Sequence, residues 1–98
     1  MTAGVAHPGL PAELTIYTAA QTRLELLEWL GAAPDDAGEP FVIDGSAVTE
    51  VDGAGVQLLV ALSRSLLAQG RRLAIAAPAE ALASACVVLG AASLMEAP

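Results

Sequence analysis

Residues with side chains able to perform chemistry are few in this chain and widely separated. It has one histidine, His7, and one cysteine, Cys86, which lie near opposite ends of the sequence. A cysteine nucleophile needs a base beside it, and a metal site needs several ligands at short spacing. The sequence shows neither pattern. We therefore expect no catalytic residue, no metal site, no cofactor and no enzymatic activity.

The basic residues exclude several kinds of phosphate and covalent chemistry. The four cations are all arginine, so the chain lacks the lysine of a P-loop, a pyridoxal-phosphate Schiff base or a receiver-domain phosphoaspartate site. The formal net charge is −7, which argues against nucleic-acid binding, because that affinity comes mainly from neutralised phosphates. The isolated Gly-x-Gly at Gly53 and Gly55 is weak evidence for nucleotide binding, since turn geometry explains it equally well.

Three features of the sequence indicate the cellular compartment of the protein. The single cysteine cannot form an internal disulfide, which fits a reducing compartment. The first residues lack the charged start and apolar run of a signal peptide. No apolar stretch approaches the roughly 20 residues of a membrane-spanning helix. We expect a cytoplasmic protein without direct membrane insertion.

The length of 98 residues predicts one domain. Pro8 and Pro11 disfavour a helix near the N-terminus, so we expect a flexible arm over 1–9 followed by a single domain over 10–98. Strand material before the first helix is expected to be short, which leaves the first strand abbreviated. The composition of 31–40 predicts a loop.

Three segments have the spacing of amphipathic helices. The first follows an N-cap at Thr15 and ends near Gly31, with Thr22 on its polar face and an inward face of Ile16, Ala20, Leu24, Leu27 and Leu30. The second runs from Gly53 or Ala54 to Gly70, with an inward face of Val56, Leu59, Val60, Ser63, Leu66 and Leu67. The third begins at Pro78 and ends at Gly90, and one of its faces comprises Leu82, Ala85, Cys86 and Leu89.

Two short apolar runs, Phe41–Asp44 and Leu73–Ala76, have the length and composition of buried strands. The alternation of helices and strands predicts an α/β domain. Because the elements are few, we expect a small mixed β-sheet with helices packed mainly on one face.

The segment from Val42 to Val56 resembles a STAS domain, the fold of anti-sigma-factor antagonists. The family pattern is a hydrophobic strand, an Asp, a loop of the type Val-Thr-x-Val-Asp, two small or hydroxyl residues, a Gly and an aliphatic residue that opens a helix. Weaker similarity at Glu13–Thr15 and at Gln69–Leu73 extends the resemblance over about residues 10 to 90. It implies a mixed sheet, no cofactor and a function in docking to a partner.

The same resemblance draws attention to a missing hydroxyl group. In anti-sigma-factor antagonists, a kinase-like anti-sigma factor phosphorylates a Ser or Thr of the loop, and the added charge prevents docking. The positions that carry this hydroxyl are Gly53 and Ala54 here, and neither can accept a phosphoryl group. The usual switch is therefore absent, or has moved to Ser46 or Thr49.

We expect a protein partner to bind at the loop and the start of the second helix, through Thr49, Glu50, Asp52, Gly53, Ala54, Gly55, Val56 and Gln57. An apolar patch around Ala54 and Val56 would pack on the partner, with polar side chains at its rim. Asp52 is also expected to cap the helix. The resemblance implies a regulatory protein of bacterial signalling, such as an anti-sigma factor, serine kinase or chemotaxis-type protein. The alternative is the ATPase of a phospholipid-trafficking ABC transporter, where small STAS proteins serve as regulatory subunits.

Overall fold

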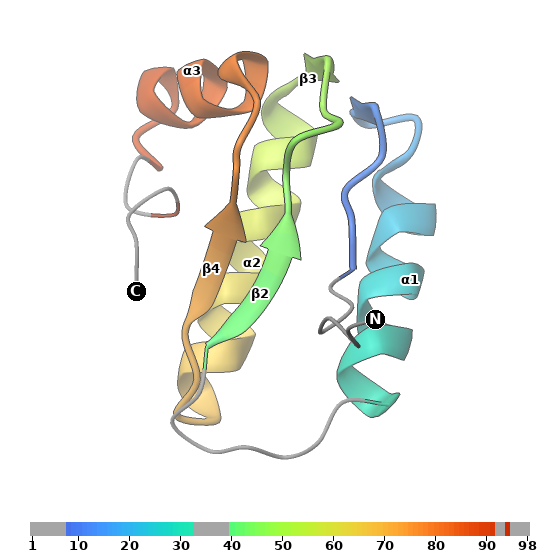
Figure 1. The fold of residues 1–98 in the computed structure, drawn as a ribbon, viewed down its shortest axis with the longest axis vertical. Helices are drawn as coiled ribbons and strands as arrows, with labels where there is room; N and C mark the ends of the chain where they lie inside the picture. Colours follow the sequence, from blue (N-terminus) through green and yellow to red (C-terminus); the bar gives the residue numbers. More distant parts are fainter. Residues whose placement is uncertain (1–7, 33–39, 92–93, 95–98) are drawn as a thin grey trace, which may run out of the picture.

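The computed structural model describes residues 8–32, 40–91 and 94, and its helices and strands alternate as the sequence predicts (Figure 1). In chain order the elements are β1 (Glu13–Leu14), α1 (Ala19–Ala32), β2 (Phe41–Asp44), β3 (Glu50–Val51), α2 (Gly53–Ala68), β4 (Leu73–Ala76) and α3 (Glu80–Val88). The two apolar runs form β2 and β4, and the three expected helices all form. β1 is short, as expected for the first strand.

The strand pairs of the described residues are parallel. β2 pairs with β4 along its whole length, and β1 pairs with β3 so that Glu13 lies opposite Glu50 and Leu14 opposite Val51. The chain ahead of β1 links the two pairs, because Gly9 forms a bridge with Asp44. Since parallel neighbours cannot be joined by a tight turn, the intervening helices serve as the connections.

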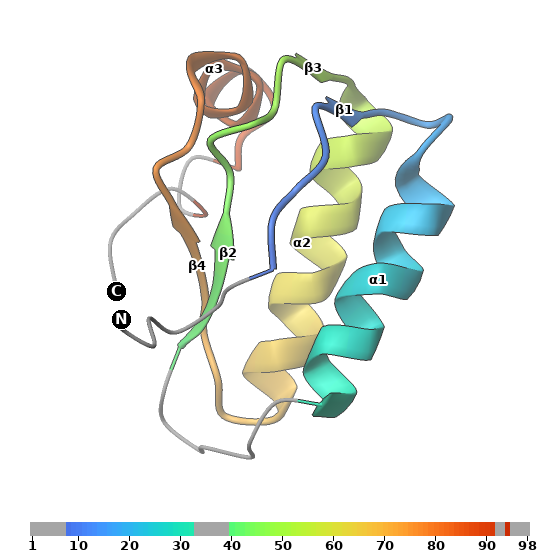
Figure 2. The ribbon, with the colours of Figure 1, turned by 45° about the vertical axis from the view of Figure 1, so that its right-hand side comes forward.

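α1 and α2 lie side by side on one face of the strands (Figure 2). α3 lies at the end of the molecule where β1, β3 and the start of α2 meet, which we call the loop end (Figures 1 and 2). The core between these layers is aliphatic, and Ile43, Leu59 and Leu82 are fully buried in it. The expected α/β fold class, with helices mainly on one face, is confirmed.

The orientation of α1 differs from the sequence prediction. Thr22, expected on the polar face, is buried together with Leu26, whereas Leu24 and Leu27 are about half exposed. Apolar residues surround most of this helix, so the 3.6-residue period fits more than one inward face. Packing against α2 selects the face that carries Thr22 and Leu26.

The inward faces of α2 and α3 agree with the prediction at most positions. The expected core residues that are buried are Val56, Leu59, Leu66, Leu82 and Cys86. Leu67 and Leu89 were expected inward but are at least half exposed, and Leu62, which the prediction omitted, is buried. Leu62 lies one turn before Leu66 on the same side of α2, whereas Leu67 is rotated away from it.

Two of the predicted segments lie largely outside the described residues. The loop predicted over 31–40 falls mostly in 33–39, and the arm predicted over 1–9 falls mostly in 1–7. At the end of that arm, the Pro8 carbonyl accepts a hydrogen bond of 2.9 Å from the Asp44 N–H. The first helix begins at Ala19 rather than directly after Thr15, because a turn separates them.

Gly55 allows α2 to approach β1 closely. A Cβ added at this position would overlap the carbonyl oxygen of Leu14 and lie 2.9 Å from its carbonyl carbon. Backbone atoms cannot move aside as a side-chain tip can, so only glycine fits here. Gly53, two residues earlier, has open space around it.

Substitution at these two glycines should therefore have opposite effects. We expect Gly55→Ala to lower the free energy of unfolding by about 3 kcal/mol, because a methyl group is forced against the backbone of β1. Gly53→Ala should raise it by about 0.5 kcal/mol, because alanine restricts the unfolded chain without a clash. Urea denaturation of both variants measures this. Equal stability of the two variants would contradict the close approach at Gly55.

Candidate functional site: the loop end

The loop end is assembled around the carboxylate of Asp52. Its Oδ1 accepts a hydrogen bond of 3.0 Å from the Gly55 N–H, which makes Asp52 the N-cap of α2. Its Oδ2 accepts a second bond, of 3.1 Å, from the Ile16 N–H in the turn after β1. Its own N–H donates to the Leu14 carbonyl at 3.3 Å. The expected helix cap is confirmed, and the same side chain also holds the β1–α1 connection.

These hydrogen bonds favour the charged form of Asp52. The N–H of Ile16, followed by that of Gly55, lowers the pKa of Asp52 below its ordinary value, against a smaller opposing effect of desolvation. The carboxylate therefore carries a full negative charge at neutral pH and is held in a fixed position.

The loop before β3 is held by the carbonyl oxygen of Ala12. This oxygen accepts hydrogen bonds from the Thr49 N–H at 2.7 Å, the Thr49 hydroxyl at 3.2 Å and the Glu50 N–H at 3.0 Å. Further back, the Ser46 N–H donates to Asp44 Oδ1 at 2.9 Å, so Asp44 stabilises the turn after β2. Hydrogen bonds thus hold the loop between β2 and β3 at both of its ends, from Ser46 to Asp44 and from Thr49 to Ala12.

The eight predicted docking residues do not all reach the surface. Those that are exposed or partly exposed are Thr49, Glu50, Gly53, Ala54 and Gln57. Gly55 and Val56 are buried, because Gly55 lies against Leu14 and Val56 belongs to the core. The expected apolar patch around Ala54 and Val56 is therefore wrong. Asp52 is half buried and uses both carboxylate oxygens within the domain.

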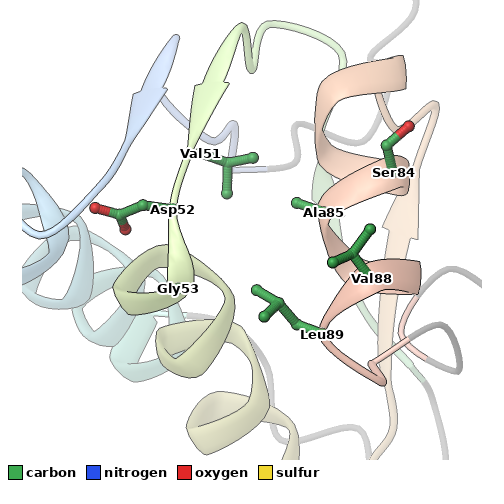
Figure 3. Close-up of a pocket in the computed structure, with 7 residues that line it drawn as sticks. All are labelled: Val51, Asp52, Gly53, Ser84, Ala85, Val88 and Leu89. Carbon is green, nitrogen blue, oxygen red and sulfur yellow. The ribbon is translucent and has the colours of Figure 1, made fainter.

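An apolar hollow lies on the other side of the loop, between the start of α2 and α3 (Figure 3). It is open to solvent, has a volume of about 340 Å³, and is lined by Val51, Asp52, Gly53, Ser84, Ala85, Val88 and Leu89. Val51 and Leu89 point into it from opposite sides, whereas the Asp52 carboxylate points away from α3 (Figure 3). The apolar surface at the loop end is thus provided by β3 and α3 together.

A second hollow continues the first along α2. Its volume is about 350 Å³, and it is lined by Gln57, Val60, Ser63, Arg64, Leu89, Gly90, Ala91 and Leu94. Leu89 lines both hollows. Because Gly53, Gln57, Val60 and Arg64 are three or four residues apart, they form one face of α2 along this groove.

The contribution of α3 to the site was missed from the sequence. Val87, Val88 and Leu89 are all strongly exposed, at 63%, 81% and 50%. Three consecutive apolar residues at the end of a helix cannot all face the core, because each is rotated by about 100° from the last. That run was the available signal for an exposed apolar surface.

Acidic side chains gather at the loop end. Glu13 and Glu50 are opposite one another in β1 and β3, Asp52 follows at the start of α2, and Glu80 lies in the first turn of α3. Like charges directly across a strand pair repel. Arg64 is in the second half of α2, and Arg71 and Arg72 lie between α2 and β4, so all three are nearer to the far end of α2 than to its start.

Titratable groups suited to catalysis do not gather in the described part of the chain. No three His, Cys, Asp or Glu residues there are placed to hold a metal ion. Cys86 is fully buried, and burial raises the pKa of its thiol, which disfavours the reactive thiolate. His7 lies outside the described residues. None of the described helices is long and apolar enough to cross a membrane.

The charge on Asp52 should make stability depend on pH in a specific way. The lowered pKa means that the carboxylate stabilises the fold above the unfolded-state pKa of about 3.9, and that this contribution is lost as pH falls toward the lower, folded-state pKa. Asp52→Asn should therefore be less stable than wild type at pH 7, and the difference should shrink below about pH 4.

Urea denaturation between pH 7 and pH 3 measures this difference. Glu25→Gln is the control, because it removes the same charge from an exposed position on α1. A difference for Asp52→Asn that stays constant over this pH range would show that the charge is not responsible.

Comparison with known proteins identifies the family of the chain. The family model described as "Mlab, STAS domain" matches residues 10–96, which covers every element described above. No curated protein and no solved structure matches the chain. The extent of the match agrees with the loop motif and with the α/β fold, and the chain belongs to the STAS domain family.

Proposed function

We propose that this protein is a non-enzymatic interaction module that docks a regulatory partner at its loop end. The observation that carries the proposal is the open apolar hollow between the start of α2 and α3. STAS domains are generally non-enzymatic interaction modules, which supports the same class of function. An exposed apolar surface beside ordered polar loops is typical of a protein–protein contact.

The docking surface has an apolar centre and a polar rim. The centre comprises Val51, Val88 and Leu89, and the rim comprises Thr49, Glu50, Gly53, Ala54 and Gln57. The small residues Gly53 and Ala54 leave room for the partner's backbone near the start of α2. Because hydrogen bonds to Ala12 and Asp52 order this region before binding, association would require little further loss of loop entropy.

The charge of the loop end indicates what the partner presents. Glu13 and Glu50 face each other without a cation from either β1 or β3. A partner arginine or lysine placed beside this pair would relieve the repulsion and gain a charge-assisted hydrogen bond. The complementary surface therefore has basic residues around an aliphatic or aromatic side chain that enters the hollow.

Our first candidate for this partner is a signalling protein of an anti-sigma-factor or chemotaxis type. The protein would act as an anti-sigma-factor antagonist-like regulator in the bacterial cytoplasm, but without the usual phosphorylation switch. Gly53 and Ala54 occupy the positions of the phosphorylated residue in that family, and they have no hydroxyl. The Thr49 hydroxyl is hydrogen-bonded to Ala12, which argues against a relocated switch there.

A second candidate is the ATPase of a phospholipid-trafficking ABC transporter. The missing hydroxyl favours it, because a permanent subunit of a complex needs no phosphorylation switch at its interface. The partner's identity distinguishes the two candidates. Both require the same docking surface.

Two adjacent valines provide a matched test of docking. Val88 lines the hollow and Val87 does not, although both are exposed on α3. We expect Val88→Glu to weaken partner binding at least tenfold, because it places a charge in an apolar contact, whereas Val87→Glu should bind as wild type does. Ala54→Asp, in the first turn of α2, should also abolish binding while the helix is retained, since acidic residues suit that position.

The partner is first identified by affinity capture with wild type, keeping only proteins that Val87→Glu also captures. Calorimetry with the purified partner then measures the three variants. Circular dichroism confirms that each variant is folded. If Ala54→Asp and Val88→Glu both bind with wild-type affinity, the loop end is not the docking surface.

Removal of one charge from the facing pair Glu13 and Glu50 should affect stability and partner binding in opposite directions. Glu50→Gln should raise the free energy of unfolding by a few tenths of a kcal/mol, because it removes the repulsion with Glu13. The same change should slow association with a basic partner, and it should make the association rate less dependent on salt concentration. Stopped-flow association at two salt concentrations measures this, with Glu25→Gln on α1 as a control of equal charge. An unchanged association rate would contradict a basic partner surface.

A further inference from the structure

One face of α1 is apolar and exposed over most of the helix. Ala20, Leu24, Leu27 and Gly31 are all exposed, and their separations of four, three and four residues place them in one line along α1. We call these four residues the α1 stripe. Single exposed leucines are ordinary on protein surfaces, whereas a continuous apolar line on a helix marks a contact surface.

The α1 stripe is independent of the face that α1 buries. Thr22 and Leu26 face the core, and the helix is thus apolar on two sides. In the turn before α1, Ile16 and Tyr17 are also exposed, at 67% and 90%, and they add apolar surface near the start of the helix. The core of the domain therefore covers one face of α1, whereas the α1 stripe is not covered by the core.

The spacing of the α1 stripe is that of a coiled-coil seam. With Leu24 at position a and Leu27 at position d, Ala20 and Gly31 occupy the neighbouring d and a positions. The flanking g and e positions are then Arg23 and Glu28. Both are exposed, and neither has an ion-pair or hydrogen-bond partner among the described residues.

We propose that the α1 stripe binds a second copy of this chain, with the two α1 helices parallel. In a parallel pair, Leu24 and Leu27 of the two copies meet along the seam. A g residue of one helix lies beside the e residue five positions later in the other, so Arg23 of each copy faces Glu28 of the second copy. The stripe is thus complementary to itself in charge as well as in shape.

The charges also select the direction of the helices. An antiparallel pair places g positions beside g positions and e beside e, so it brings no Arg23 to a Glu28. The parallel arrangement forms this contact twice, once on each side of the seam. Arg23 and Glu28 are five residues apart, too far around the helix to pair within one copy.

Dimerisation through α1 leaves the loop end accessible. α1 lies on one side of α2, and α3 lies on the other (Figure 2). The dimer would therefore present two docking surfaces. The self-association is a separate property, and it does not depend on the proposed partner.

Sedimentation equilibrium of the purified protein tests the proposal directly. Since the stripe is short, we expect a weak association, with the mass rising from 9.8 kDa toward twice that value between about 10 µM and 1 mM. Leu24→Glu should remain monomeric over this range. Leu67→Glu is the matched control, because Leu67 is a similarly exposed leucine on α2 outside the stripe, and it should dimerise as wild type does.

Charge reversal then tests the parallel arrangement. Arg23→Glu and Glu28→Arg should each weaken self-association about tenfold, because each places like charges together on both sides of the seam. A mixture of these two variants should dimerise again, since every contact then joins an arginine to a glutamate. The double variant carrying both changes should self-associate as wild type does. Circular dichroism of each variant controls for loss of the fold.

Three results would overturn the proposal. A mass of 9.8 kDa for wild type at all concentrations would show that no dimer forms. A dimer that persists in Leu24→Glu would show that another face is responsible. A dimer lost in Leu24→Glu but unaffected by either charge reversal would exclude the parallel pairing of Arg23 with Glu28.

Discussion

The close contact between the first turn of α2 and β1 is the constraint on which the loop end depends. Gly55 brings the helix against the Leu14 backbone, and Asp52 accepts N–H groups from both Gly55 and Ile16. These contacts bring together segments that are far apart in the chain. Because the contact is made by backbone atoms and a charged cap, it fixes the direction of α2 as well as its position. The start of α2 also lines the apolar hollow beside α3, through Asp52 and Gly53.

The same contact divides the loop motif into structural and exposed residues. Asp52, Gly55 and Val56 hold the fold, so their identity reflects packing and hydrogen bonding within the domain. Gly53 has open space around it, and Gly53 and Ala54 both lie at least partly at the surface. A side chain added at Gly53 would therefore change the surface of the loop end without disturbing the contact between α2 and β1.

Residue patterns predicted the role of a residue correctly where that role depends on its neighbours in the sequence. Asp52 was predicted as a cap because a carboxylate before an apolar helical pattern has one strongly favoured role, and Cys86 was predicted in the core from its spacing. Val56 shows the limit of such patterns, because its place in the motif indicated the surface while packing put it inside. α3 was missed as part of the site because it contributes through space: Val88 comes close to Val51 only when α3 crosses the end of β3.

The sequence by itself determined the fold class, the order of the elements and the helix cap. Each of these follows from local propensity, a motif or composition. Tertiary structure alone decided which face of α1 is buried, because its apolar residues fit several orientations and only packing on α2 selects among them. It also decided where the apolar surface at the loop end lies. That surface is made by residues from β3 and α3, whose proximity depends on long-range packing rather than on any local pattern.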